Sequence, residues 1–496
     1  MIKRILFTTF LCYVSLQFNP LIAQIQIGDE IDGEAAMDLF GEPVVISSNG
    51  TRIASGAIGN GENSGHVRVF DLIGGNWEQV GSDIDGENSG DASGFSVSLS
   101  SSGNRIAIGA PSNDIGGVDT GYVRIFDLID GNWVQIGSSI EGENSGDLSG
   151  YSVSLSSEGN RIAISAIINN GNGEVSGHVR IFDFSEGNWI QLGSDIDGEA
   201  EYDYSGYSIG LSANGDKLII GAFQNDGNGD GSGHARIFRF TGADWIQMGS
   251  DIDGEAAGDE SGEDVAISSN GNIVAIGAHV NDGNGLNSGH VRVYKYNGSD
   301  WDQLGDDIDS ESPGDRSGHS VSLSSDGNIL AVGAVFNDAS GSNSGHVRIF
   351  QLIDGNWVQI GEDIDGETAG DFFGISVALS ADGRNVVIGG SRNDGNGFSS
   401  GHLRVFGDLP LSVVDELNET EFVIYPNPVQ DILGFSDVEF QINEIKIYSI
   451  IGKLVKSISN EVNILSTIDV SDLVSGVYLI HFKSKDKTSI KKFIKQ

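Results

Sequence analysis

Six tryptophans stand at equal intervals along this chain and constrain its fold more than any other feature. The six, each 56 residues after the last, are Trp77, Trp133, Trp189, Trp245, Trp301 and Trp357. The same sequence returns around each of them, so that nearly everything between residues 24 and 407 is one unit copied. A fixed period of this length is typical of propellers and solenoids.

One unit, residues 317–360, has the pattern of four short strands. Residues 320–324 and 346–352 alternate apolar and polar side chains, as half-buried strands do. Residues 329–335 are almost continuously apolar, which suits a strand that is covered on both faces. Residues 356–361 supply a fourth strand after a tight turn rich in Asp, Gly and Asn. Four such strands joined by hairpins form one propeller blade.

Counting the strands gives the number of blades. The third-strand motif begins seven times, at His66, Tyr122, His178, His234, His290, His346 and His402. The fourth strand follows only six times, but residues 24–34 align with residues 357–367 and can supply the missing copy. The sequence therefore predicts an all-β, seven-bladed propeller of four-stranded blades closed by its N-terminal strand, which leaves no open sheet edge.

The segments outside the repeat have other compositions. Residues 1–23 combine Lys3 and Arg4 with an apolar run and predict a secretory signal peptide. That run is too short to span a bilayer, so we expect a protein that does not cross the membrane. Residues 24–408 are the predicted propeller, residues 409–421 a polar linker, and residues 422–496 a small β-sandwich with alternating runs. Cys12, the only cysteine, lies in the signal peptide, so no disulfide is expected.

The net charge of −44 lies almost entirely on the repeats. It argues against nucleic acid as a partner, because phosphate binding needs clustered Lys and Arg. The acidic residues gather in the loops between the second and third strands and in the connections between blades. Both kinds of loop leave an antiparallel blade on the same side, so we predict one acidic loop face and one face of tight turns.

One of these loops contains part of a calcium-binding motif. Asp226, Asn228 and Asp230 fit the first half of a D-x-[DN]-x-[DN]-G loop, and Asp282 with Asn284 is a weaker copy. The twelfth position holds Ile237 instead of the usual Glu. Calcium is therefore a hypothesis for these loops, and ordinary turn chemistry is the alternative.

The other recurrent residues favour structural roles over catalysis. Paired carboxylates in each connection could serve a glycosidase, but they recur in every blade, whereas an active site needs one blade that differs. We therefore expect no enzyme and no catalytic residues. The recurrent His and Trp are interpreted as packing residues. The seven third-strand arginines, Arg68 and its equivalents, are expected to pair with carboxylates of the connections and to fix the joins between blades.

Two resemblances to known families extend this interpretation. Phe40-Gly41 and Phe373-Gly374 begin first strands, and Gly109-Ala110-Pro111 ends a second strand. On these residues, the repeats resemble FG-GAP repeats, the propeller units also found in integrin alpha subunits. In that family calcium often binds between the first and second strands, where this chain has only a short turn such as Ser324–Asn328.

The C-terminal segment carries four short motifs in order. They include Tyr425, Pro426, Asn427 and Pro428, then Gly452, then Gly476 and Tyr478, and finally Lys491–Lys495. The segment resembles the type A sorting domain of the type IX secretion system of Bacteroidetes. This resemblance implies contact with the secretion machinery, export across the outer membrane, and a final place at the cell surface or outside the cell.

These observations leave three functions open. The first is a secreted or cell-surface binding or adhesion protein whose acidic loop face recognises an extracellular glycan or protein. The second is a secreted glycan-degrading enzyme, and the third is a purely structural surface protein. A nearly uniform repeat favours the first and the third, since a catalytic centre would be asymmetric.

Overall fold

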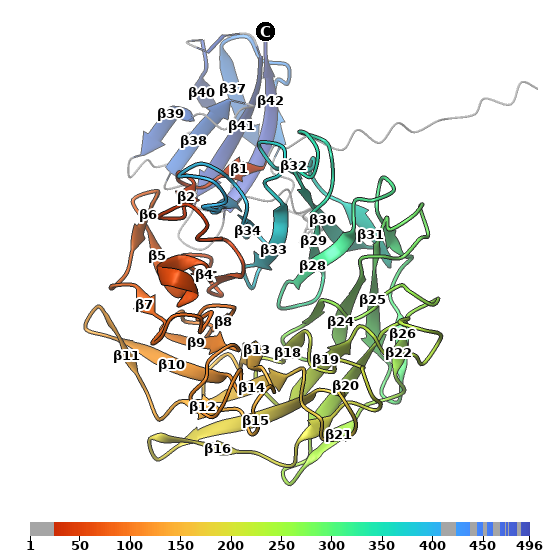
Figure 1. Ribbon diagram of the computed structural model, residues 1–496. Helices are drawn as coiled ribbons and strands as arrows, with labels where there is room; N and C mark the ends of the chain where they lie inside the picture. Colours follow the sequence, from red (N-terminus) through yellow and green to blue (C-terminus); the bar gives the residue numbers. More distant parts are fainter. Residues whose placement is uncertain are drawn as a thin grey trace, which may run out of the picture.

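The structure is a computed structural model that describes residues 24–407, 423–436, 444–449, 454–459, 467–471, 473–474, 476–483 and 488–496. The predicted signal peptide and linker lie outside the described residues, and the predicted domain boundaries stay predictions. Residues 24–407 form seven β-sheets arranged in a ring (Figure 1). The predicted seven-bladed propeller is therefore confirmed.

Each blade has four main strands and one short strand. The first strands are β3 (Val44–Ile46), β8 (Ser96–Leu99), β13 (Ser149–Leu155), β18 (Ile209–Leu211), β23 (Val265–Ile267), β28 (Ser317–Leu323) and β33 (Phe373–Leu379). The second strands are β4 (Arg52–Ala57), β9 (Arg105–Ala110), β14 (Arg161–Ala166), β19 (Lys217–Ala222), β24 (Ile273–Ala278), β29 (Ile329–Ala334) and β34 (Val386–Gly390). The third strands are β5 (His66–Ile73), β10 (Tyr122–Ile129), β15 (His178–Ser185), β20 (His234–Phe240), β25 (His290–Tyr296), β30 (His346–Ile353) and β35 (His402–Gly407).

The fourth strand of each blade is split into two pieces, which the sequence did not predict. The longer pieces are β1 (Ile25–Gln26), β6 (Asn76–Gln79), β11 (Asn132–Gln135), β16 (Asn188–Gln191), β21 (Trp245–Gln247), β26 (Trp301–Gln303) and β31 (Asn356–Gln359). The short pieces are β2 (Ile31–Asp32), β7 (Ile84–Asp85), β12 (Ile140–Glu141), β17 (Ile196–Asp197), β22 (Ile252–Asp253), β27 (Ile308–Asp309) and β32 (Ile364–Asp365). Both pieces pair with the same third strand. In the first blade Gly81, with φ of +75°, separates them, because this left-handed conformation favours glycine.

The N-terminal strand closes the ring as predicted. β1 pairs antiparallel with β35 of the seventh blade, with Ile25 opposite Gly407 and Gln26 opposite Phe406. β2 continues along the same strand, with Ile31 opposite Leu403. The first residues of the repeat region thus complete the blade that the last residues begin.

The tryptophans connect neighbouring blades. Each indole Nε1 donates a hydrogen bond of 2.7–3.3 Å to a backbone carbonyl on the fourth strand of the preceding blade. The acceptors, in chain order, are Ile27, Val80, Ile136, Leu192, Met248 and Leu304. The apolar core also lies between blades, since Ile237 of the fourth blade packs in one cluster with Val274 and Trp301 of the fifth. The predicted packing role of the tryptophans is confirmed.

A closed circle of hydrogen bonds joins the blades at the face of tight turns. The backbone N–H of one residue per blade donates to the carbonyl of the equivalent residue in the next blade. The circle runs through Ser48, Ser101, Ser157, Ala213, Ser269, Ser325 and Ala381 and returns to Ser48. These residues, with an apolar residue from each first strand, line a cavity of about 170 Å³ at the axis.

The glycines of the FG and GA motifs lie where two blades approach most closely. A Cβ atom at Gly277, in β24, would lie 2.0 Å from the carbonyl oxygen of Gly318 in the next blade. Gly318 itself has φ of +91°. The close contact disfavours a side chain at the first position, where only the third blade has one, Ser165. The backbone conformation disfavours a side chain at the second position, so both glycines recur.

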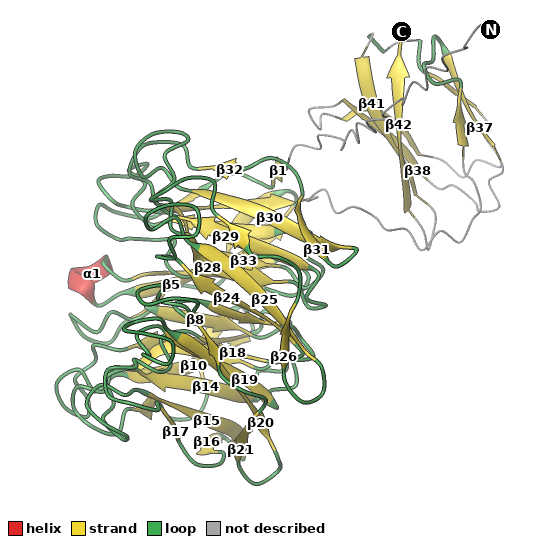
Figure 2. Ribbon diagram, turned by 90° about the vertical axis from the view of Figure 1, so that its right-hand side faces the viewer, coloured by secondary structure: helices red, strands yellow, loops and turns green. Residues whose placement is uncertain are grey.

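The two faces of the ring differ as predicted. Seen from the side, long loops project from one face, and the short helix α1 (Asn60–Asn63) lies among them (Figure 2). These are the loops between second and third strands and the connections between blades. We call this side the loop face.

The C-terminal residues form two sheets that share one core. One sheet contains β36 (Val423–Tyr425), β37 (Ile432–Ser436) and β40 (Thr467–Asp469). The other contains β38 (Glu444–Ser449), β39 (Leu454–Ser459), β41 (Gly476–Lys483) and β42 (Thr488–Lys495). Leu433 and Ile468 from the first sheet pack with Ile447 and Phe493 from the second. The predicted small β-sandwich is confirmed.

Candidate functional site on the loop face

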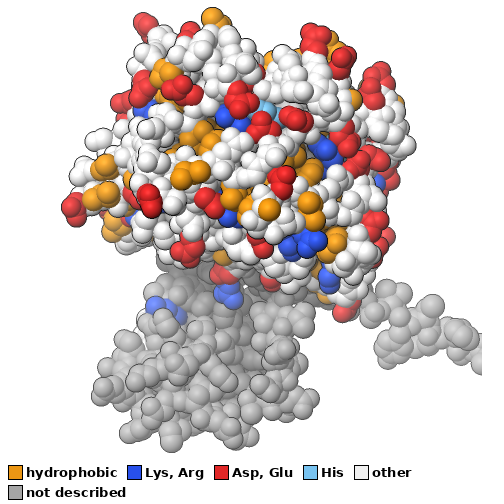
Figure 3. All heavy atoms as spheres, turned by 90° about the horizontal axis from the view of Figure 1, so that it is seen from below, with side chains coloured by type: hydrophobic (Ala, Val, Ile, Leu, Met, Phe, Trp, Pro, Cys, Tyr) orange, Lys and Arg blue, Asp and Glu red, His pale blue; other side chains and the backbone are white. Residues whose placement is uncertain are grey.

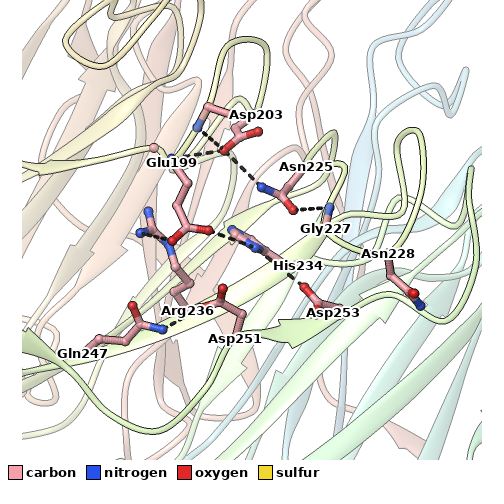
Figure 4. Close-up of polar contacts among 12 residues, drawn as sticks. Glu199, Asp203, Asn225, Gly227, Asn228, His234, Arg236, Gln247, Asp251 and Asp253 are labelled. Carbon is pink, nitrogen blue, oxygen red and sulfur yellow. Dashed lines mark hydrogen bonds and ion pairs between the residues drawn. The ribbon is translucent and has the colours of Figure 1, made fainter.

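The predicted calcium ligands lie in the loop between β19 and β20, and all three are exposed. The Oδ1 atom of Asp226 accepts a hydrogen bond of 2.8 Å from the backbone N–H of Gly231, within the same loop. Asn228 points away from the neighbouring polar cluster (Figure 4), and its amide donates to two carbonyls of the following connection, one of them that of Glu255 at 2.8 Å. The structure therefore gives Asp226 and Asn228 roles in the loop itself, while Asp230 stays exposed. Calcium at these residues remains a prediction.

The weaker copy repeats this arrangement in the fifth blade. The Oδ1 atom of Asp282 accepts a hydrogen bond of 2.7 Å from the N–H of Asn287. Asn284 donates from its amide to the carbonyl of Ser310 in the following connection, also at 2.7 Å. Holding the loop onto the connection is the turn chemistry that the sequence left as an alternative, and it accounts for the recurrence of the motif.

The second recurrent acid of the connections is buried and organises the loop face. Asp203 is only 2% exposed, and its Oδ2 atom accepts hydrogen bonds from the backbone N–H groups of Glu199 and Ala200. The same oxygen accepts a hydrogen bond of 3.1 Å from the side-chain amide of Asn225, which begins the next long loop. Three other blades have this pair, namely Asp147 with Asn169, Asp259 with Asn281, and Asp315 with Asn337. These carboxylates are therefore structural.

The third-strand arginine holds the join between two blades (Figure 4). Arg236 donates from its Nη2 atom to the carbonyl of Asp197 at 2.7 Å, and its Nη1 atom lies 3.5 Å from the carboxylate of Glu199. Equivalent arginine–glutamate ion pairs of 3.5–3.9 Å join Arg68 to Glu34, Arg124 to Glu87, Arg180 to Glu143, Arg292 to Glu255, and Arg404 to Glu367. The predicted pairing is confirmed in these six blades. In the remaining blade Arg348 donates to the carbonyl of Asp309.

The third-strand histidine is buried beside this ion pair. The Nδ1 atom of His234 lies 3.9 Å from Glu199 and 4.0 Å from Asp253, and the side chain is 1% exposed. Burial lowers the pKa of His234 to about 4, with Arg236 acting in the same direction, so the imidazole is neutral. With Glu199 and Asp251 it forms a group that could hold a metal ion. However, the guanidinium of Arg236 already gives Glu199 a positive partner. The predicted packing role of the histidines agrees with their burial, at 0–2% exposed in all six blades.

One ring of positions breaks the repeat. The residue that follows the first-strand glycine is not constant around the ring, and in blade order it is Glu42, Phe95, Tyr151, Tyr207, Glu263, His319 and Ile375. Burial raises the pKa of Tyr151, and Tyr207, which is hydrogen-bonded to it, raises it further, as do Glu263 and Glu42. Glu263 and Glu42 belong to blades that do not neighbour that of Tyr151, so residues from distant blades converge here. We call these seven residues the axial ring. It lies at the loop-face end of the central axis, since first strands begin on that face.

The axial ring has an aromatic side and an acid–imidazole side. The rings of Phe95, Tyr151 and Tyr207 follow one another at centroid distances of 4.8 and 5.1 Å, and Phe223 continues the row 4.5 Å beyond Tyr207. Across the ring, Glu263 meets two histidines from the fifth and sixth blades. The sequence repeat did not predict these two unlike sides of the axial ring, because each difference between blades is a single residue in a 56-residue unit. The signal that could have found it is a position that varies where its neighbours repeat.

The predicted sorting motifs come together in the C-terminal sandwich. The side-chain oxygen of Asn427 accepts a hydrogen bond of 2.8 Å from the N–H of Ile494, in the final strand. Tyr478 stacks on Phe493 with centroids 5.5 Å apart and donates from its hydroxyl to Val474. Tyr425, Pro426 and Pro428 are exposed around Asn427. Gly452 lies outside the described residues.

Solved structures with similar folds are distant in sequence. Hydrazine synthase of Kuenenia stuttgartiensis is 12% identical with a TM-score of 0.46, over 77% of this chain and 98% of that one. A proposed 6-phosphogluconolactonase from Bacteroides uniformis is 12% identical with a TM-score of 0.49, over 70% of this chain and 94% of that one. No curated protein matches this chain in sequence. Similarities this weak carry no functional argument.

Two family matches identify parts of the chain. No helix among the described residues has the length and apolarity needed to cross a membrane. Residues 423–496 match the secretion system C-terminal sorting domain, which implies export by the type IX secretion system to the cell surface or the extracellular space. Residues 309–350 match the FG-GAP repeat. The chain thus combines a seven-bladed propeller of FG-GAP-type repeats with a C-terminal sorting domain of type IX secretion.

Proposed function

We propose that this exported protein is a binding or adhesion protein whose loop face engages an extracellular glycan or protein. The observation that carries the proposal is a set of apolar loop tips on that face. Val118, Leu286 and Phe398 occupy the same repeat position in three long loops and are 67%, 71% and 69% exposed. We assign the contact with the ligand to these large apolar side chains, because they are exposed at one fixed position of the long loops.

The loop tips are held in place by the neighbouring connections. The carbonyls of Val118 and Leu286 accept hydrogen bonds of 2.8 and 2.9 Å from Gly146 and Gly314, one connection away. The carbonyl of Phe398 accepts a hydrogen bond of 2.8 Å from the backbone N–H of Met37, whose side chain is itself 54% exposed. A side chain presented on a fixed backbone loses less conformational entropy on binding, so these tips suit recognition.

The charge of the surface narrows the class of ligand. Asp and Glu side chains are scattered widely over the outer side of the propeller that Figure 3 shows, whereas Lys and Arg appear there in few places. With a net charge of −44, the protein would repel polyanions and favour neutral glycans or basic protein surfaces. Calcium at Asp226, Asn228 and Asp230 is part of this proposal, since a bound cation would offset part of that charge.

Binding of the whole exported chain to arrays of defined glycans and purified surface proteins tests the proposal. The triple variant V118S/L286S/F398S should lose binding by 10-fold or more. The control I190S/I246S changes two exposed isoleucines, 56% and 42% exposed, on the fourth strands β16 and β21, and should bind like the parent. Equal binding by both variants would contradict the proposal, and no binding by the parent would favour a structural surface protein.

The calcium component and the enzymatic alternative have separate tests. Calcium should raise the melting temperature of the parent relative to a chelator, and D226N/D230N should abolish that difference. An unchanged melting temperature would leave only turn chemistry at the loop. We propose a protein without catalytic activity, so incubation with polysaccharides should release no sugar products, and robust turnover would favour the glycan-degrading alternative.

A further inference from the structure

Glu263, His279 and His319 meet at the loop-face end of the axis, although they lie in or beside three different strands. Glu263 precedes β23, His279 follows β24, and His319 lies in β28 of the next blade. The Nδ1 atom of His279 is in direct contact with the Oε2 atom of Glu263. The Nε2 atom of His319 lies 4.0 Å from the other oxygen of the same carboxylate. The two imidazole rings are 5.7 Å apart between centroids, edge to face.

These side chains are buried and leave polar atoms without hydrogen bonds. The side chain of His279 is 5% exposed and that of Glu263 is 12% exposed. Among the described residues, the Nδ1 of His279 and the Oε2 of Glu263 have no hydrogen-bond partner. Buried polar groups are normally paired, and these two atoms touch without forming a hydrogen bond. A cation bound by both would supply the partner that each lacks.

We propose that Glu263, His279 and His319 bind one divalent transition-metal ion, with zinc as the foremost candidate. Two imidazoles and one carboxylate are a common ligand set for zinc and for non-haem iron, and they leave coordination positions open to water or a substrate. Calcium fits less well, because it takes six to eight oxygen ligands. This site uses other side chains than the predicted calcium ligands, although His279 begins the loop that contains Asp282 and Asn284. It does not depend on the proposed binding of a glycan or protein.

A second carboxylate supports the assignment of His279 as a ligand. The Nε2 atom of His279, on the side of the ring away from Glu263, lies 3.6 Å from Glu260. The side-chain amide of Gln224 in turn donates a hydrogen bond of 2.9 Å to the other carboxylate oxygen of Glu260. A histidine that binds a metal through one ring nitrogen typically donates a hydrogen bond from the N–H of the other to such a carboxylate. This hydrogen bond fixes the orientation of the ring and its tautomer. Glu260 is thus a positioning residue.

The charges around the site are compatible with a cation. A ligand imidazole must be neutral, and the burial of His279 and His319, which are 5% and 23% exposed, suits that form. Arg316 is the nearby positive group, and its guanidinium lies 4.9 Å from the ring centroid of Phe336. A bound cation would thus face two carboxylates, those of Glu263 and Glu260, and this one positive group.

The other blades do not repeat the ligand set. Glu42 is the one other glutamate in the axial ring, and Ser391, the equivalent of His279 in the preceding seventh blade, donates a hydrogen bond of 3.1 Å to its carboxylate. The remaining equivalents of His279 are Ile58, Pro111, Ile167, Phe223 and Val335. One metal ion per chain is therefore expected, and Glu42 offers a matched control of the same residue type.

Titration calorimetry of the purified whole chain with Zn²⁺, and absorption spectra with Co²⁺, test the proposal. The parent should bind one Zn²⁺, and Co²⁺ should show visible bands of a nitrogen- and oxygen-ligated site. E263Q and H279Q should lose these bands and bind Zn²⁺ at least about 10-fold more weakly, whereas E42Q should match the parent. E260Q should keep the Co²⁺ bands but weaken binding by about 10–100-fold.

Three results would overturn the proposal. One is Zn²⁺ binding that is unchanged in both E263Q and H279Q. Another is equal loss in E42Q, which would mean that general acidity binds the ion. The third is a stoichiometry near six, which would assign the ion to the third-strand histidines of every blade. Circular dichroism of each variant shows that it is folded, and if H279Q does not fold, E260Q decides by the expected weakening.

Discussion

Trp77 donates a hydrogen bond of 2.8 Å from its indole nitrogen to the backbone carbonyl of Ile27. This contact joins the first blade to the strand that begins the propeller. It has the same form as the bond from Trp133 to Val80 in the next blade and from Trp245 to Leu192 further on. The neighbouring blade therefore contacts the N-terminal strand as it would an ordinary fourth strand, and six of the seven joins between blades have this bond.

Replacing one third-strand arginine should destabilise the propeller. R236A removes the donor to the carbonyl of Asp197 and leaves Glu199 without its partner, so we expect the free energy of unfolding to fall by about 1–3 kcal/mol. Thermal or denaturant unfolding measures this. The control is R384A, because Arg384 is 62% exposed and pairs only with exposed Asp382, so its loss should change little. Equal effects of the two substitutions would contradict the role given to the joins.

The buried histidines should make the protein less stable in mild acid. The pKa of His234 is about 4 in the fold because burial disfavours the charged ring, whereas a histidine in the unfolded chain has its ordinary pKa of 6.5. Between these values the unfolded chain binds a proton that the fold does not, so stability is lost as pH falls from about 6.5 to about 4.

The chain contains its own substitute for this histidine. Tyr122 occupies the equivalent position in the second blade. H234Y should therefore reduce the slope of unfolding free energy against pH by up to about 1.4 kcal/mol per pH unit within that window, and Y122H should steepen it. Unfolding measured from pH 4 to pH 7.5 gives both slopes. Identical slopes in the parent and the two variants would show that these imidazoles titrate normally in the fold.

The sorting domain should be required for export. A chain that ends before residue 423 should remain inside the cell envelope of a host with type IX secretion, because the matched domain is missing. N427A should reduce export, since Asn427 accepts the 2.8 Å hydrogen bond that attaches its loop to Ile494. T467A, an exposed change on β40, is the control. Immunoblots of cell and culture fractions measure the outcome, and full export of the truncated chain would contradict it.

The large features of the fold could be read from the sequence, because they depend on periodicity. The spacing of Trp77 and Trp133 fixed the unit, and the match of residues 24–34 to residues 357–367 located the closing strand. The split of each fourth strand was not predicted. It depends on the backbone conformation at Gly81 and its equivalents, and a glycine in a short polar stretch is also compatible with an ordinary turn.

The candidate site was harder to predict, because it depends on contacts between distant residues. Asn228 resembles a metal ligand in sequence, but its amide lies against the carbonyls of the next connection. Glu263 and His319 are 56 residues apart and belong to different blades, so nothing local connects them. Their proximity follows only from the closure of the ring, which brings the same position of every blade to one axis.

The central claim, that the ring is closed by its own N-terminal strand, is tested most directly by hydrogen exchange of the whole protein followed by mass spectrometry. The N–H of Ile27 donates a hydrogen bond of 2.8 Å to the carbonyl of Val405, and the N–H of Val80 donates an equal one to the carbonyl of Val69. Peptides covering residues 24–32 should therefore exchange as slowly as peptides covering residues 77–85, over minutes to hours. Complete exchange of residues 24–32 within seconds, while residues 77–85 stay protected, would show that the strand is free and the ring open.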